Sequence, residues 1–140
     1  MGAADDANVI RLASVKVGTP TILGEIHGER VWSGIRKRSV APTTVLWVSA
    51  LNLAGDGQAD LSVHGGVDKA VYAYPFEHLD PWAQELAEEL GEAPFGENLS
   101  TFGALERDAR IGDIWQWGSA LLQVTVGYEN SIITLLLHTR

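Results

Sequence analysis

The sequence predicts a mainly β fold, a barrel or sandwich of short strands into which one α-helix is inserted. Three observations support this fold class. Valine- and isoleucine-rich segments dominate the first half, turn residues recur at short intervals, and one later segment has helical spacing. The chain has 140 residues, a length that suits one domain. We therefore expect a single domain over residues 1–140.

The first half is expected to contain five strands. Residues 9–18 form a β-rich segment that ends at Gly18, and residues 19–34 indicate two strands joined by a hairpin turn at His27 and Gly28. Residues 43–53 are expected to form a further strand. Residues 69–75 form the next, which Pro75 ends because proline cannot donate to a ladder.

Residues 76–94 contain the expected helix. Asp80 is a suitable N-cap, Pro81 fits the first helical position, and Gly91 fits the C-terminal stop. Apolar side chains recur three or four residues apart, which predicts one apolar stripe along the helix. The stripe consists of Leu79, Trp82, Leu86 and Leu90.

Beta-type segments return after the helix. Residues 95–101 are expected to be a loop that enters a short strand, and residues 111–126 a hairpin that turns at Gly118 and Ser119. Within this hairpin we expect Trp115 and Trp117 on different faces, one in the core and the other at the rim.

Composition excludes several classes of function. The chain has 18 acidic and 10 basic residues, a net charge of -8, which argues against nucleic acid as a partner. It has no cysteine, so it offers no disulfide and no thiolate ligand. No apolar run is long enough for a membrane helix, and the start lacks a secretory signal, so we expect a cytoplasmic protein without a membrane partner.

A glycine turn supplies the first candidate site. His64 precedes Gly65 and Gly66, and these glycines would let a ligand approach the backbone closely while the imidazole forms a hydrogen bond. A tight turn whose histidine caps a carbonyl explains the same residues. Lys69 follows, either as an anion contact or as a surface partner of a nearby aspartate.

Other polar residues also allow two interpretations. Arg36 and Arg38 would share one strand face opposite Lys37, to bind phosphate or to protect a sheet edge. Asn98 offers a donor and an acceptor, for a polar heterocycle or for a turn. Asp56 lies in a segment without the ligand order of a calcium loop, so a turn that accepts backbone hydrogen bonds is expected there.

Taken in order, several motifs resemble the MOSC domain family, named for the C-terminal domain of molybdenum cofactor sulfurase. The motifs are SGIRKRSV, GDGQADLSVHGGVDKAVYAYPFEH, FGENLST and IGDIWQWGSALLQVT. The chain is most similar to stand-alone bacterial proteins of the 6-hydroxylaminopurine-resistance type. The resemblance implies a β-barrel-like fold that binds the molybdenum cofactor, a phosphorylated pterin dithiolene.

The resemblance also implies a set of cofactor-binding residues. In this family the HGG turn borders the cofactor pocket, the two lysines would face its anionic end, and the asparagine would face the pterin. Tyr74, with His78, would line the mouth. The implied cofactor-binding set is Lys37, His64, Gly65, Gly66, Lys69, Tyr74 and Asn98. Related proteins reduce N-hydroxylated bases with redox partner proteins, or carry sulfur to the cofactor.

The C-terminal segment departs from the family. Where members have a cysteine that ligates molybdenum, residues 126–140 read VGYENSIITLLLHTR. We therefore expect a C-terminally truncated or altered domain that binds the cofactor weakly or not at all, and assign no catalytic residue or metal ligand. Catalysis, cofactor delivery and a purely structural role stay open. The apolar stretch SIITLLL must pack into the barrel, join a second copy of the chain, or lie exposed.

Overall fold

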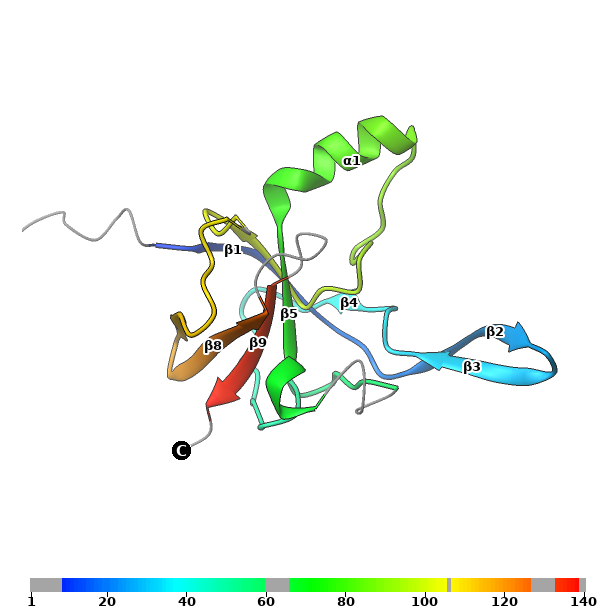
Figure 1. Cartoon of the computed structure of the whole chain (residues 1–140), viewed down its shortest axis with the longest axis horizontal. Helices are drawn as coiled ribbons and strands as arrows, with labels where there is room; N and C mark the ends of the chain where they lie inside the picture. Colours follow the sequence, from blue (N-terminus) through cyan, green and yellow to red (C-terminus); the bar gives the residue numbers. More distant parts are fainter. Residues whose placement is uncertain (1–8, 60–65, 106, 127–132, 139–140) are drawn as a thin grey trace, which may run out of the picture.

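The computed structural model describes residues 9–59, 66–105, 107–126 and 133–138. These residues form one curled sheet, a hairpin that projects from it, and a single α-helix (Figure 1). The prediction of a mainly β fold with one inserted helix is confirmed. The sheet is an open half-barrel with edge strands β4 and β7.

The sheet has seven strands in the order β4-β1-β6-β5-β9-β8-β7. Strands β5 and β6 run parallel, and the other neighbouring pairs are antiparallel. Parallel neighbours need a crossover connection, and the helix α1 lies within the segment that joins β5 to β6. The strands are β1 (Arg11–Val17), β4 (Arg38–Ser39), β5 (Val71–Pro75), β6 (Leu99–Phe102), β7 (Ile114–Trp117), β8 (Ala120–Val126) and β9 (Ile133–His138).

Both predicted hairpins are confirmed. Among the described strands, β2 (Thr21–Ile26) and β3 (Glu29–Ser33) pair only with each other, and they project away from the sheet (Figure 1). Their turn residues His27 and Gly28 have φ values of 52° and 81°, as a two-residue turn with two left-handed positions requires. The hairpin of β7 and β8 turns at Gly118, whose φ is 59°.

The core lies along the centre of the sheet, where β5, β9 and β8 are neighbours. Alternate side chains of these strands are apolar and closed off from solvent, and Leu53 and Ala109 join them from the connecting segments. The buried apolar cluster consists of Leu53, Ala70, Val71, Ala73, Leu99, Ala109, Leu122, Val124, Ile133, Leu135 and Leu137.

Helix α1 (Leu79–Leu86) is shorter than the sequence predicts. A 3-10 turn, η3 (Phe76–His78), precedes it, so the N-cap is His78 rather than Asp80. The helix ends at Ala87, whose φ of 54° is left-handed, four residues before the expected stop at Gly91. None of its residues is buried, so packing does not hold a longer helix against the sheet.

The strand expected over residues 43–53 is largely absent. These residues form turns and one isolated bridge between Val48 and Leu53. The Ser49 amide donates to the carbonyl of Asn52, which closes a tight turn in the middle of the expected strand. Val45 and Trp47 remain 84% and 82% exposed, and no strand of the described part of the chain pairs with them. The β propensity of this segment is therefore not satisfied by pairing.

The apolar C-terminal stretch packs into the sheet. Strand β9 lies between β5 and β8 and pairs with both, and Ile133, Leu135 and Leu137 are buried in the core. Of the three expectations for SIITLLL, the structure shows packing within the chain's own sheet. The described residues of the stretch are thus not available as an exposed surface for a second copy of the chain.

Trp115 and Trp117 lie on the same face of β7, and the expectation that they lie on different faces is wrong. Side chains two residues apart on a strand point the same way. Both indoles pack partly buried against the core, whereas Ile114 and Gln116 are exposed on the other face.

Candidate functional site

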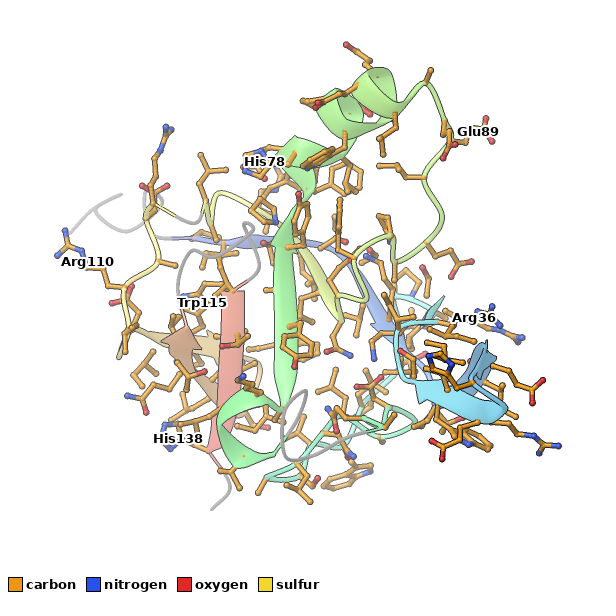
Figure 2. All side chains as sticks on the ribbon, turned by 45° about the vertical axis from the view of Figure 1, so that its right-hand side comes forward. Arg36, His78, Glu89, Arg110, Trp115 and His138 are labelled. Carbon is orange, nitrogen blue, oxygen red and sulfur yellow. The ribbon has the colours of Figure 1, made fainter. Side chains whose placement is uncertain are left out.

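A buried ion pair joins Lys37 of the basic segment to Asp56, which lies between Gly55 and Gly57. The Lys37 ammonium lies 2.6 Å from Asp56 Oδ1, and the two side chains are only 4% and 0% exposed. Lys37 therefore points inward, whereas Arg36 and Arg38 are exposed, with Arg36 at the molecular surface (Figure 2). This is the opposition of faces that the sequence predicts. It leaves the charge of Lys37 balanced by a carboxylate.

Close backbone contacts position this ion pair. A side chain at Gly18 would collide with the carbonyl oxygen of Arg36, and one at Gly34 with that of Gly57. The glycines therefore allow three chain segments to meet around the Asp56 carboxylate. Asp56 Oδ1 also accepts a hydrogen bond of 3.0 Å from the Gly18 amide, which confirms that this turn aspartate accepts from the backbone.

Two buried side-chain oxygens in the segment that carries Asp56 lack a donor. Among the described residues, Asp56 Oδ2 and Gln58 Oε1 are buried and have no hydrogen-bond partner. The Gln58 Nε2 group donates to the carbonyl of Ala70 at 3.3 Å, which directs this side chain toward the start of β5. An unpaired buried acceptor costs about 1–3 kcal/mol, so these oxygens suit a ligand that brings N–H or O–H donors.

Tyr72, a residue of strand β5, lies within electrostatic range of Asp56. Burial raises the pKa of the Tyr72 hydroxyl above its ordinary value of 10.0, and the negative charge of Asp56 raises it further. The hydroxyl therefore keeps its proton at neutral pH. The Tyr72 hydroxyl can donate a hydrogen bond, whereas the unpaired oxygens Asp56 Oδ2 and Gln58 Oε1 can only accept one.

Asn98 ties the start of β6 to two other strands. Its side chain is fully buried; Oδ1 accepts from the Tyr72 amide at 3.0 Å, and Nδ2 donates to the Lys16 carbonyl at 3.1 Å. The backbone of Asn98 bonds to the same two residues. Both functional groups of the amide are thus engaged within the protein, and Asn98 positions β1 and β5 relative to one another.

A second buried ion pair, which the sequence did not predict, lies beside Asn98. Lys16 Nζ lies 3.3 Å from Glu97 Oε1 and also donates to Ser100 Oγ. Burial lowers the pKa of Lys16, and the neighbouring Glu97 opposes this shift without cancelling it. The available signal was a lysine between Val15 and Val17 within a β-rich segment.

Tyr74 lies near the end of β5, where α1 begins. It is 1% exposed, stacks on Phe95 with ring centroids 4.4 Å apart, and accepts a hydrogen bond of 2.8 Å from Trp82 Nε1. His78 meets the same ring edge-on and lies at the base of the helix (Figure 2). These contacts attach α1 to the sheet.

The structure brings part of the predicted set together. Asn98 Oδ1 accepts from the Tyr72 amide, the negative charge of Asp56 raises the pKa of the Tyr72 hydroxyl, and Asp56 accepts from Lys37, so Lys37 and Asn98 lie in the same part of the protein. Gly66 and Lys69 lie at the short helix η2 (Val67–Lys69) that leads into β5; Gly66 has a φ of 89°, and the Lys69 amide donates to its carbonyl. His64 and Gly65 lie outside the described residues.

Across the described ranges, no three His, Cys, Asp or Glu side chains gather closely enough to hold a metal ion. Within the same ranges, no helix has the length and apolarity needed to span a bilayer.

The comparison with known proteins decides the family. The sequence model of the MOSC domain matches residues 60–129, half of the 140-residue chain. The chain belongs to the MOSC domain family. The resemblance seen in its motifs is thereby confirmed.

Two relatives of this MOSC domain are similar in sequence over long segments. YflK of Bacillus subtilis is 42% identical over 112 residues, which cover 80% of this chain and 49% of YflK. YiiM of Escherichia coli is 52% identical over 83 residues, which cover 57% of this chain and 37% of YiiM. The chain thus spans about half the length of one relative and just over a third of the other.

The fold of this MOSC domain is also found in a solved relative. The crystal structure of YiiM from Geobacillus stearothermophilus superposes with a TM-score of 0.65 at 25% identity, covering 92% of this chain and 68% of that protein. This coverage is larger than the half of the chain that the family model matches.

Proposed function

We propose that this MOSC domain binds the molybdenum cofactor through its pterin and phosphate groups. The observation that carries the proposal is the pair of buried acceptors, Asp56 Oδ2 and Gln58 Oε1, that lack donors within the described part of the chain. A pterin offers several N–H donors on one ring edge. Two fixed acceptors beside a protonated tyrosine suit such an edge, since a few placed polar groups orient a ligand in its site.

The residues have distinct proposed roles. Lys37 holds the Asp56 carboxylate in place and so positions an acceptor, while Asn98 fixes the strand ends around Tyr72. Gly66 and Lys69 would meet the phosphate at the turn before β5, where a left-handed glycine allows close approach. His64 and Gly65 belong to the same proposed set. Tyr74, which contacts Trp82 of α1, is proposed to line the mouth of the site.

The donor set fits the pterin better than it fits the metal. A soft thiolate is the protein ligand that suits a molybdenum dithiolene centre, and this chain has no cysteine. When bound, the cofactor supplies oxidation and reduction at molybdenum. The residues of this chain would bind and orient the organic part. We therefore propose holding or delivery of the cofactor as the role of this segment, in a family linked to reduction of N-hydroxylated bases and to sulfur carriage.

Equilibrium dialysis against cofactor released from a molybdoenzyme tests the proposal. Molybdenum is measured by elemental analysis, and the pterin by its fluorescence after oxidation. We expect the protein to retain pterin, weakly for lack of a thiolate, and molybdate alone not to be retained. Asp56→Asn should weaken retention, because it removes the carboxylate charge and turns one buried oxygen into a donor group.

Asp108→Asn is the control variant, because it changes an exposed carboxylate away from the site and should leave pterin retention unchanged. If the folded wild-type protein retains no pterin, the domain has a structural role and the binding proposal fails. If Asp56→Asn retains as much pterin as wild type, the binding site lies elsewhere.

A further inference from the structure

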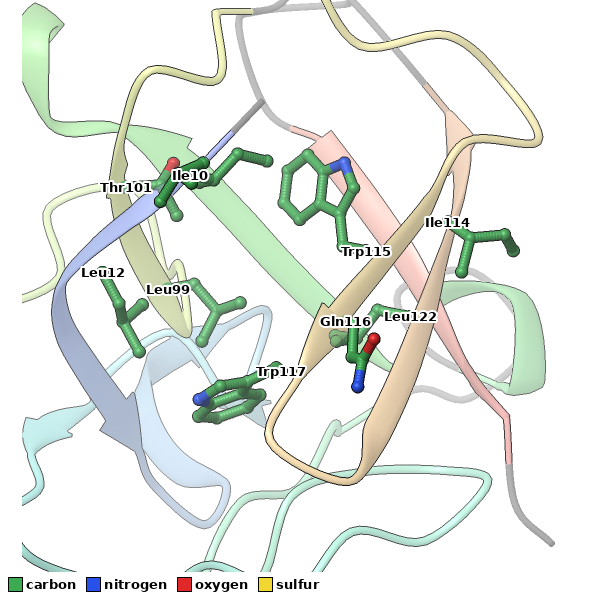
Figure 3. Close-up of a pocket in the computed structure, with 10 residues that line it drawn as sticks. Ile10, Leu12, Leu99, Thr101, Ile114, Trp115, Gln116, Trp117 and Leu122 are labelled. Carbon is green, nitrogen blue, oxygen red and sulfur yellow. The ribbon is translucent and has the colours of Figure 1, made fainter. Parts of the chain in front are cut away.

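The concave face of the curled sheet forms an apolar cleft separate from the site above. One wall comes from β1 and β6, the other from β7 and β8, and β5 and β9 lie behind (Figure 3). In the strand order β6 and β8 are separated by β5 and β9, so Leu99 and Leu122 can line one cleft only because the sheet curls. Its volume is about 350 Å³, within the range of small-molecule sites.

The walls of this cleft differ in character. Leu12 and Leu99 make one side aliphatic, and the indoles of Trp115 and Trp117 make the other aromatic (Figure 3). No lining residue among those described carries a charge. Leu12 remains 41% exposed, so apolar surface faces the solvent here. A neutral molecule with a flat apolar body would remove that surface from water.

One polar atom lies in this apolar setting. Thr101 shares the face of Leu99 because the two are two residues apart on β6, and it lines the same cleft. The residue is 2% exposed, and its Oγ1 has no hydrogen-bond partner among the described residues. A buried hydroxyl without a partner is destabilising, and a ligand's polar group would satisfy it.

We propose that the cleft binds a planar, uncharged aromatic molecule that carries one hydrogen-bonding group. The ring system packs between the leucines and the indoles, and the polar group bonds to the Thr101 hydroxyl. The anionic cofactor proposed above cannot be this ligand, because nothing charged lines the described cleft to receive its phosphate. Binding here is independent of the Asp56 region, so either proposal can fail alone.

The test uses two probes, 2-naphthol and naphthalene, which differ by one hydroxyl. Equilibrium dialysis gives the affinity of each probe for wild-type protein and for Thr101→Val, which keeps the β-branched shape and removes the hydroxyl. We expect saturable binding of both probes. The affinity ratio of 2-naphthol to naphthalene should fall by roughly twofold to tenfold in Thr101→Val, the effect of one neutral hydrogen bond.

Two tryptophan variants complete the experiment. Trp117→Leu should weaken both probes, because it removes one aromatic wall, whereas Trp32→Leu alters an exposed indole on the projecting hairpin and should change neither affinity. Circular dichroism verifies that each variant is folded. An unchanged affinity ratio in Thr101→Val, or no saturable binding by wild type, overturns the proposal. So does a wild-type dimer, seen by sedimentation equilibrium, that Trp117→Leu dissociates, because the cleft would then hold a second copy of the chain.

Discussion

The Lys37 ammonium lies 2.6 Å from the Asp56 carboxylate, and both side chains are closed off from solvent. This relationship changes the expected character of the candidate site. The motif suggests Lys37 as an anion contact, but the Asp56 carboxylate already balances its charge. The unpaired oxygen of Asp56, Oδ2, becomes the feature that a ligand can use. The candidate site is therefore better described by its unpaired hydrogen-bond acceptors than by a positive charge.

Breaking this ion pair should destabilise the fold. Lys37→Met leaves the Asp56 charge buried without its partner, and we expect a loss of about 3–5 kcal/mol in the free energy of unfolding. Urea denaturation measures this loss. Lys37→Met combined with Asp56→Asn should be less destabilised than Lys37→Met alone, because no buried charge remains. Arg36→Met, at the exposed neighbouring cation, should change stability by no more than about 0.5 kcal/mol.

Asn98 should matter for stability whether or not a ligand binds. Asn98→Leu leaves the Tyr72 amide and the Lys16 carbonyl without their side-chain partners. At about 1–3 kcal/mol for each buried group, we expect a loss of about 2–6 kcal/mol in unfolding experiments. Gln84→Leu, on the exposed face of α1, provides the matched control. Equal stabilities of the two variants would contradict the bridging role of Asn98.

The buried Lys16 predicts a specific pH dependence. Its pKa in the folded protein lies below the ordinary value of 10.5, so between these two values the unfolded chain binds more protons than the folded one. The contribution of Lys16 to the free energy of unfolding therefore rises with pH in that window and levels off above 10.5.

A reference protein isolates this contribution. Lys16→Met combined with Glu97→Gln removes both members of the buried pair. The difference in unfolding free energy, wild type minus double variant, should increase as the pH approaches the ordinary lysine value from below. Urea titrations at a series of pH values measure it. A difference that is flat or falls with pH would show that burial does not lower the pKa of Lys16.

The attachment of α1 depends on an aromatic contact. The helix has no buried residue, and Trp82 reaches Tyr74 through one hydrogen bond and lies 5.9 Å from Phe95 between ring centroids. Trp82→Ala should increase amide hydrogen exchange in residues 79–86 while the β5 amides stay protected. Tyr74→Phe removes the hydroxyl that accepts from Trp82 Nε1 and should cost about 0.5–1.5 kcal/mol for that hydrogen bond. Unchanged exchange in Trp82→Ala would mean that other contacts hold the helix.

Strand β9 should be as important to the core as any central strand. Leu135 is fully buried, and Leu135→Ala should destabilise the protein by about 2–5 kcal/mol in urea denaturation. Leu86→Ala, at a side chain that is 51% exposed, makes the same substitution outside the core and should have a much smaller effect. If the two variants are equally stable, the C-terminal stretch does not pack where the structure places it.

Local features were predictable where a few adjacent residues decide the conformation. The turns at His27–Gly28 and Gly118 were found because left-handed positions favour glycine and the flanking β-branched residues favour strands. The helix boundary was less predictable, since Asp80 and Gly91 are suitable caps that the fold does not use. Helix length depends on what the apolar stripe packs against, and here Trp82 contacts Tyr74 and Phe95 whereas Leu86 is 51% exposed.

The amino-acid order by itself determined the mainly β class, the two hairpins, the opposition of Lys37 to Arg36 and Arg38 and, through its motifs, the family. Only the tertiary structure decided that Lys37 meets Asp56, that Lys16 meets Glu97 81 residues away, and that β9 enters the middle of the sheet. The physical reason is the separation along the chain of the residues that interact. Turns and strand faces follow from neighbouring residues, whereas a buried charge finds its partner only when distant segments pack together and exclude water.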